Sequence, residues 1–279
     1  MPIDPDEYRQ QSHEVWERIA ANWGEEREFI HSVTAPVNER MIERLDPKPG
    51  DTVLDLAAGT GDTGFLAATI VGEDGRLIST DFASAMVDSA RGVSAELGLG
   101  NVEHRVLDAE RMDLEDSSVD KVLCRFGYML MADPAAALAE TRRVMRDDGR
   151  LCFAVWTTPD QNPWAFLPGL VLVERGHLPP PEPGAPGIFA MGDPERIREL
   201  VTGAGFAEPE TEQVEVAWPY ADADAHWSLT RKLAGPLADA IDELDEDERE
   251  AVRADVRSRI EPLIADGPVT GRVHVVTTA

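Results

Sequence analysis

Short apolar runs that alternate with helical segments between residues 50 and 156 constrain the fold of this chain most. The strand-like runs occupy residues 52–56, 77–80, 102–107, 119–126 and 150–156, and the helical segments occupy 65–71, 85–97 and 134–145. Strands that alternate with helices at this spacing form βαβ units, whose strands are parallel and whose crossovers are right-handed. The chain therefore predicts an α/β protein with a doubly wound, mostly parallel sheet.

The flanking sequence predicts additions to this core of residues 50–156. Residues 1–49 have apolar positions at helical spacing and form a helical N-terminal segment. Residues 157–192 are too proline-rich for sheet or continuous helix, and we interpret them as a lid because the sheet resumes afterwards. Residues 193–279 complete the sheet with strands at 210–219 and 269–278 on either side of a helical insertion, 223–265.

The composition of the chain limits the classes of partner that it can bind and indicates where in the cell it works. The chain has 26 Lys and Arg against 53 Asp and Glu, a net charge of −27 that repels nucleic acid and anionic membrane surfaces. No apolar run reaches the roughly 20 residues that cross a bilayer, and the first residues lack signal-peptide character, so we expect a cytoplasmic protein. Cys124 and Cys152 stand in apolar runs without metal-ligand spacing, which favours a place in the core and predicts no metal.

The turn after the first strand contains the pattern GxGxxG at Gly59, Gly61 and Gly64. This pattern alone also fits an NAD(P) site, where the loop carries a pyrophosphate at a helix N-terminus. Asp55 in the strand and Asp62 in the loop oppose such an anion, whereas they suit a cationic ligand. S-adenosylmethionine (SAM) carries an ammonium, a sulfonium and no phosphate, and this loop favours it.

Two further carboxylates follow later strands. Asp81 ends the second strand about twenty residues after the loop, where it can accept hydrogen bonds from ribose hydroxyls of either cofactor. Asp108 follows the third strand, where it can accept a bond from an adenine amino group. All three carboxylates in register with three strands favour a SAM site.

With these residues the chain resembles the class I SAM-dependent methyltransferases, and within them the group typified by ubiquinone and menaquinone C-methyltransferases. The resemblance covers residues 50–156 well, and its motifs are VLDLAAGTGD at 53–62, TDF at 80–82 with Met86, DAE at 108–110, DKVLCRF at 120–126 and AETRRVMRDDGRL at 139–151. It implies a Rossmann-like, seven-stranded sheet whose last strand is antiparallel. The segment after Phe126 lacks the Arg-Asn pair of the quinone enzymes, which disfavours a quinone acceptor.

The resemblance also implies roles for single residues. It places the methionine end of SAM against Asp55, Ala57, Gly59, Thr60, Gly61 and Arg125, the ribose against Asp81, and adenine against Phe82, Met86, Asp108 and Ala109. The segment 16–23 resembles the helix that closes over SAM in this group, with Trp23 at the position of a common aromatic residue.

Methyl transfer to an activated carbon depends chiefly on positioning, so catalytic groups leave a weak pattern. We name Tyr128 and His31 as catalytic candidates, with His177 and His226 on the lid and insertion as lesser ones. The aromatic residues that can line a pocket for a small, partly apolar acceptor, or equally pack a helical cap, are Trp164, Phe166, Phe189 and Trp227.

The main prediction is a SAM-dependent methyltransferase that acts at carbon, oxygen or nitrogen of such an acceptor. Two alternatives stay open from the sequence: an NAD(P)-dependent oxidoreductase and a SAM-binding protein without transferase activity.

Overall fold

The computed structural model describes residues 4–182 and 184–279, so residues 1–3 of the N-terminal segment and residue 183 of the expected lid lie outside the described residues. The strands are β1 (Thr52–Asp55), β2 (Arg76–Asp81), β3 (Val102–Val106), β4 (Val119–Arg125), β5 (Met145–Trp156), β6 (Glu210–Trp218) and β7 (Val269–Thr278). The helices are α1 (Pro5–Glu25), α2 (Arg27–Leu45), α3 (Asp62–Val71), α4 (Ser84–Glu96), α5 (Pro134–Val144), α6 (Pro163–Glu174), α7 (Pro194–Gly203), α8 (Ala223–Leu233), α9 (Gly235–Asp242) and α10 (Glu246–Ala265).

The strands form one sheet in the order β3-β2-β1-β4-β5-β7-β6. β1 to β5 run parallel to one another, whereas β7 pairs antiparallel with both β5 and β6. The predicted mostly parallel, seven-stranded sheet with an antiparallel last strand is therefore confirmed. Cys124 and Cys152 are free and buried in its core.

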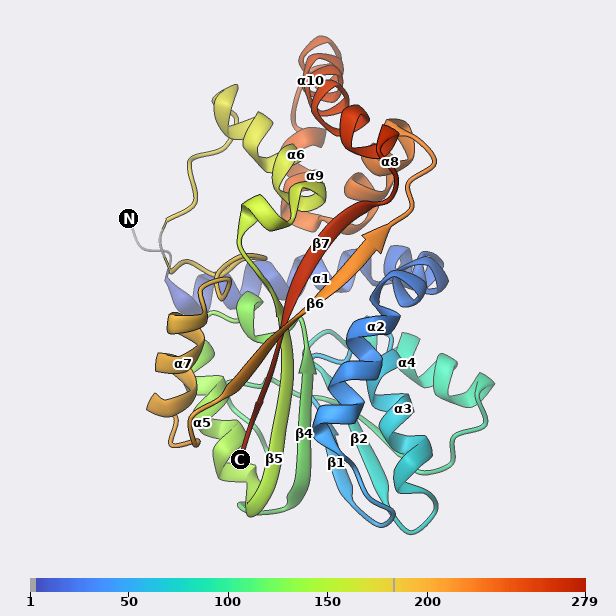
Figure 1. The fold of residues 1–279 in the computed structure, drawn as a ribbon, viewed down its shortest axis with the longest axis vertical. Helices are drawn as coiled ribbons and strands as arrows, with labels where there is room; N and C mark the ends of the chain where they lie inside the picture. Colours follow the sequence, from blue (N-terminus) through green and yellow to red (C-terminus); the bar gives the residue numbers. More distant parts are fainter. Residues whose placement is uncertain (1–3, 183) are drawn as a thin grey trace.

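The order of connection reverses between β1 and β4. From β1 the chain moves through α3 and α4 towards one edge of the sheet, and from β4 it moves through α5 towards the other. Right-handed crossovers then put α3 and α4 on one face, where α2 also packs, and α5 and α7 on the opposite face (Figure 1). Ligands of open α/β sheets bind at the carboxyl ends of strands where the order reverses, which here is the crevice between β1 and β4.

Four helices, α6, α8, α9 and α10, form a cap beyond that end of the sheet (Figure 1). The cap has its own apolar cluster, in which Val171 and Leu172 of α6 pack with Trp227, Ile241, Val252 and Val256. Helix α1 runs between the cap and the sheet, where it contacts α4 below and α8 and α9 above. Helix α6 of the expected lid and the expected insertion thus pack together as one helical unit.

Helix α6 corrects the expectation that residues 157–192 are too proline-rich for continuous helix. Pro163 lies in the first turn, where its missing N–H costs nothing. Pro168 lies inside the helix and cannot donate to the carbonyl of Trp164, but Nε2 of His226 lies 2.7 Å from that oxygen and replaces the bond. A side chain from α8 therefore lets a proline-rich segment stay helical.

Candidate functional site

The crevice between β1 and β4 is lined by the residues that end these strands. Ala57 and Phe126 follow the strands with φ of 51° and 63°, a left-handed conformation that is unusual for side chains of this kind. A Cβ on Gly127 would lie 2.7 Å from the Cβ of Ala57, so the two chain segments touch here. Strained backbone of this kind gathers at functional sites.

Asp55 ends β1 inside the crevice and is almost fully buried. Burial raises the pKa of its carboxyl well above the usual value, and the charge of Arg125 opposes this rise. Gly64, in the first turn of α3, is in close contact with this side chain, because a Cβ there would collide with Oδ2 of Asp55. The third glycine of the pattern thus leaves room for the Asp55 carboxylate and lets α3 pack closely against the sheet.

The glycine loop ties β1 to β2. The backbone N–H of Gly59 donates to Oδ2 of Asp81 over 3.0 Å, and the hydroxyl of Thr60 donates to Asp62 over 2.7 Å. Gly61, with φ of 86°, precedes α3 and packs beneath the ring of Phe65. The predicted residues 57–61 therefore form one turn around the carboxyl ends of β1 and β2.

Helix α2 supplies a polar wall, of which only His31 was predicted from the sequence. Its residues Arg27, His31, Thr34 and Asn38 lie on one helical face and point towards the crevice and the start of α3. Arg27 pairs with Asp62 at 2.7 Å, and Nδ1 of His31 lies 3.5 Å from the same carboxylate. Nη1 of Arg125 donates to Oγ1 of Thr34 at 3.0 Å. The spacing of these four residues, i, i+4, i+7 and i+11 among apolar neighbours, could have revealed this polar face from the sequence.

Five buried atoms of this wall and of the carboxylates beside it have no hydrogen-bond partner within the described part of the chain. They are Nε of Arg27, Nδ1 of His31, Nδ2 of Asn38, Oδ2 of Asp55 and Oδ1 of Asp62. Two of them, on His31 and Asp62, face each other at 3.5 Å. Buried polar atoms are normally paired, and an unpaired set in one place indicates a ligand of complementary polarity. The other three, two donors and the acceptor oxygen of Asp55, match the carboxylate and ammonium of an amino acid, which is the methionine end of SAM.

The next part of the site lies at the end of β2. Burial raises the pKa of Asp81 to about 6, although the backbone N–H groups of Gly59 and Ala83 donate to its oxygens at 3.0 Å. Ala83 and Met86 form a small buried apolar cluster with Ala20 of α1, and Phe82, Trp16 and Trp23 pack against it. The predicted adenine residues and the predicted aromatic residue of the N-terminal segment therefore lie together.

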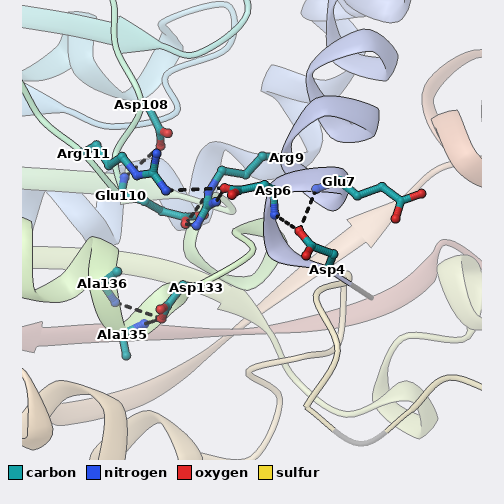
Figure 2. A network of polar contacts seen from close by, with 10 residues as sticks. All are labelled: Asp4, Asp6, Glu7, Arg9, Asp108, Glu110, Arg111, Asp133, Ala135 and Ala136. Carbon is teal, nitrogen blue, oxygen red and sulfur yellow. Dashed lines mark hydrogen bonds and ion pairs between the residues drawn. The ribbon is translucent and has the colours of Figure 1, made fainter. Parts of the chain in front are cut away.

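Helix α1 is held over this region by polar contacts. The Glu17 carboxylate accepts from the backbone N–H groups of Ser84 and Ala85, at 2.5 and 3.1 Å, and so caps α4. At the other end of the helix, Arg9 donates to Glu110 at 2.6 and 2.8 Å (Figure 2). Asp108 accepts from the N–H of Glu110 at 2.9 Å, and Ala109 between them is buried.

Arg125 ends β4 at the centre of the crevice. Burial lowers the pKa of its guanidinium, while Asp62 and Asp55 stabilise the charge. It lies 5.5 Å from the centre of the Phe126 ring, and within the described ranges no carboxylate oxygen lies within 4.0 Å of it. Arg125 thus has several donors left for a ligand.

Tyr128 does not fit the predicted catalytic role. Its side chain is fully buried below α5, where its hydroxyl lies 2.7 Å from Oγ1 of Thr141 and burial raises its pKa well above the usual value. A group that must reach a substrate cannot be held there. His31 lies beside Asp62 at the crevice, and its catalytic role stays a prediction.

The other histidine and aromatic residues predicted for the site lie either in the cap or at the crevice. His177 pairs with Glu248 at 2.8 Å on the cap, and burial lowers the pKa of His226, which supports α6. Trp227 belongs to the cap cluster, so its packing role, the second of the two expected, is the one observed. Phe166 and Phe189 contact each other at 6.4 Å, whereas Trp164 contacts rings at the crevice.

Two searches of the described residues bear on the other classes of site. They contain no group of three or more His, Cys, Asp or Glu side chains arranged to hold a metal ion. Over the same residues, no helix has the length and apolar character that crossing a membrane requires.

Comparisons with known proteins agree with this geometry. A family model described as a methyltransferase domain matches residues 47–165. The nocamycin O-methyltransferase of Saccharothrix syringae is 31% identical over 252 residues, which cover 86% of this chain and 88% of the relative. The ubiquinone/menaquinone biosynthesis C-methyltransferase UbiE of Teredinibacter turnerae is 34% identical over 177 residues, or 60% of this chain and 71% of the relative.

A solved structure shows the same fold. The Haemonchus contortus phosphoethanolamine N-methyltransferase 2, in complex with phosphomonomethylethanolamine and S-adenosylhomocysteine, superposes with a TM-score of 0.54 at 15% identity over 87% of this chain and 52% of that one. The chain belongs to the SAM-dependent methyltransferases. SAM is accordingly its methyl donor, as predicted, and the oxidoreductase and non-transferase alternatives are not favoured.

Proposed function

We propose that this enzyme methylates a small, partly apolar acceptor that binds between the crevice and the cap. The observation that carries this proposal is the set of unpaired buried atoms on Arg27, Asn38 and Asp55 beside the reversal of strand order. These atoms suit the amino-acid end of SAM, and the space for an acceptor then lies towards Arg125 and the cap. The relatives act at both oxygen and carbon, so the atom methylated is not fixed by family.

The chain's own residues would divide the binding of SAM as follows. Asp55 would receive the ammonium, and Arg27 and Asn38 the carboxylate, by charge-assisted hydrogen bonds. Asp81 would accept from the ribose, while Phe82, Met86 and Trp23 would enclose adenine beside Asp108. When bound, SAM supplies a methyl group on a positively charged sulfur, an already activated carbon.

The protein's contribution to the reaction is then mainly alignment and exclusion of water. Helix α1 covers the nucleoside side through Glu17 and Arg9, and the cap covers the acceptor side. For an acceptor that is neutral when it binds, His31 is a candidate base at the crevice. Asp62 lies 3.5 Å from its Nδ1, which would orient the ring and leave Nε2 to accept a proton from a neutral acceptor.

Calorimetry with S-adenosylhomocysteine (SAH), SAM and NADH tests the binding half of the proposal. Wild type is expected to bind SAH and SAM, and Asp55→Asn to bind both at least about tenfold more weakly because a charge-assisted bond becomes neutral. Phe206→Leu, in the core but distant from these groups, serves as the control and should bind normally. Equal SAH affinity of Asp55→Asn and wild type would contradict the assignment.

His31→Gln separates the base from the binding residues. With an acceptor that is neutral at the assay pH, kcat is expected to fall by a factor of about ten to a hundred while SAH affinity stays the same. An unchanged kcat would exclude His31 as the base. We also propose a cytoplasmic location without nucleic-acid or membrane partners, on the ground of the net charge of −27.

A further inference from the structure

Six aromatic rings gather on the cap side of the crevice, and we call them the ring cluster: Phe29, Phe126, Trp156, Trp164, Trp218 and Tyr220. Trp156 stacks on Phe126 with 4.5 Å between ring centres and 7° between planes. Trp164 of α6 lies 4.9 Å from Trp156 and 4.1 Å from Trp218. The ends of β4, β5 and β6 thus meet the cap through aromatic surfaces, directly beyond Arg125.

The ring of Phe126 is held in place by a strained backbone. Its φ of 63° is an outlier for a bulky residue, and its N–H is fixed by the carbonyl of Ala154 at 2.8 Å. Such strain persists only where the surroundings hold it, and it gathers where a ligand is positioned. Here it places a flat aromatic face between Arg125 and Trp156.

Two hydrogen-bond donors in this region have capacity for a ligand. Nε1 of Trp218 is buried and has no partner among the residues that the structure describes, and Trp218 itself is 3% exposed. Arg125 has one hydrogen bond, to Thr34, and lies against the face of Phe126. Both groups donate and neither accepts, so the missing partner is an oxygen, and beside a guanidinium an ionised oxygen is preferred.

We propose that the ring cluster is the acceptor site and that the acceptor is a planar, conjugated molecule with an ionised oxygen, a carboxylate or a phenolate. This inference rests on the proposed function, whose acceptor it specifies. Stacking on the partly exposed rings of Phe126 and Trp164 favours flat molecules over saturated ones, and the buried ring of Trp156 supports both of them. Arg125 disfavours amines, because methylation of an amine creates a positive charge beside the guanidinium.

The transfer step balances without a base. The anionic oxygen forms a bond to the methyl carbon as the carbon–sulfur bond breaks, and the electron pair of that bond stays on sulfur. The negative charge of the acceptor and the positive charge of the sulfonium cancel, and no proton moves. The products are SAH and a methyl ester or methyl ether, and Arg125 holds the oxygen in line until the bond has formed.

Four probes of one shape test this proposal: 2-naphthoic acid, 2-naphthol, 2-naphthylamine and decahydro-2-naphthoic acid. Binding to the SAH-loaded enzyme is followed by quenching of tryptophan fluorescence, and methylation with SAM by mass spectrometry. At least one of the two planar oxygen acids is expected to bind about tenfold or more tightly than both the amine and the saturated acid. Which of the two is methylated distinguishes carboxylate from phenolate.

Variants connect the binding to the named residues. Arg125→Gln should weaken the preferred acid about tenfold and leave the amine within about twofold, and Trp164→Leu should weaken the planar acid but not the saturated one. Phe206→Leu is the matched control outside the ring cluster and should change neither. Circular dichroism and SAH calorimetry of each variant report whether the fold and the cofactor site survive.

The outcomes are distinct. If wild type fails to bind SAH, the proposed function itself fails. If SAH binds but neither planar acid binds, or the saturated acid or the amine binds as tightly as the preferred planar acid, the ring cluster is not this acceptor site. An Arg125→Gln variant that binds SAH and the preferred acid as wild type does would equally overturn the assignment.

Discussion

The two sides of the crevice are built in different ways. On the sheet side, the groups that we propose to bind the cofactor lie at the ends of β1 and β2 and in the turn after β1, where Asp55 and Asp81 are spaced by the βαβ unit itself. On the cap side, the rings come from α2, β4, β5, α6 and β6, segments that are distant in sequence. Backbone geometry thus fixes the proposed cofactor site, whereas side-chain packing fixes the proposed acceptor site.

This difference predicts unequal responses to mutation. Changes at the strand ends should affect cofactor binding severely, since the backbone has no alternative conformation there. Changes in the cap should alter stability and acceptor choice while SAH binding survives. Four predictions test this division, from the largest expected effect to the smallest.

Gly64→Val should have the largest effect, a loss of SAH affinity of at least about a hundredfold. A side chain there collides with Asp55, and the carboxylate sits at the buried end of β1 with no room to move. SAH calorimetry measures the effect. Gly92→Ala is the control, because Gly92 lies in α4 with open space around it and should leave affinity unchanged. Normal affinity of Gly64→Val would refute the close contact.

Asp81 should make the stability of the free protein depend on pH. Its pKa is raised from 3.8 to about 6 in the folded state, so its contribution is present below pH 4 and is lost as pH rises to 6. Relative to Asp81→Asn, the wild-type free energy of unfolding should fall by roughly 2–3 kcal/mol between pH 4 and pH 7. Urea unfolding of both proteins at several pH values measures this, and parallel curves would contradict it.

The cap should respond through His226 without loss of SAH binding. His226→Ala removes the donor that replaces the N–H missing at Pro168, and should cost about 1–3 kcal/mol in the free energy of unfolding. In a Pro168→Ala background the backbone N–H can bond to the Trp164 carbonyl, so the same change should cost less. A double-mutant cycle by urea unfolding tests the coupling, and additive costs would show that the two residues act independently.

The ion pair that holds α1 should have the smallest effect. Glu110→Gln removes the charge that Arg9 faces, and since Glu110 is buried but Arg9 is partly exposed, we expect a loss of about 1 kcal/mol. Hydrogen exchange of α1 should increase in the same variant. Asp88→Asn breaks an exposed pair with Arg91 and should change neither quantity. Equal behaviour of both variants would remove the Arg9–Glu110 pair from the account.

The sequence predicted the sheet side better than the cap side for the same physical reason. The parallel, doubly wound sheet was predicted from the alternation of strands and helices, and the positions of Asp55, Asp81 and Asp108 from where the first three strands end. Of the wall of α2, only His31 was predicted, because the other polar residues belong to a helix outside the motif. Trp156 and Trp218 were not considered as pocket residues because only tertiary contacts bring their strand ends together.

Two errors show where local rules give way. Tyr128 follows the β4 motif closely, but the short turn after Gly127 directs it into the core towards Thr141. The proline rule failed at α6 because His226, 58 positions after Pro168 in the chain, supplies the missing hydrogen bond. In both cases a distant partner decided the outcome, and no local pattern contains that partner.

SAH calorimetry on three proteins tests the division of the crevice most directly. Wild type, Asp55→Asn and Trp164→Leu are titrated under one condition. We expect Asp55→Asn to lose about tenfold or more in SAH affinity, whereas Trp164→Leu should stay within about twofold of wild type. The reverse order, with Trp164→Leu weakened and Asp55→Asn unaffected, would contradict the assignment of the polar side to the cofactor and the aromatic side to the acceptor.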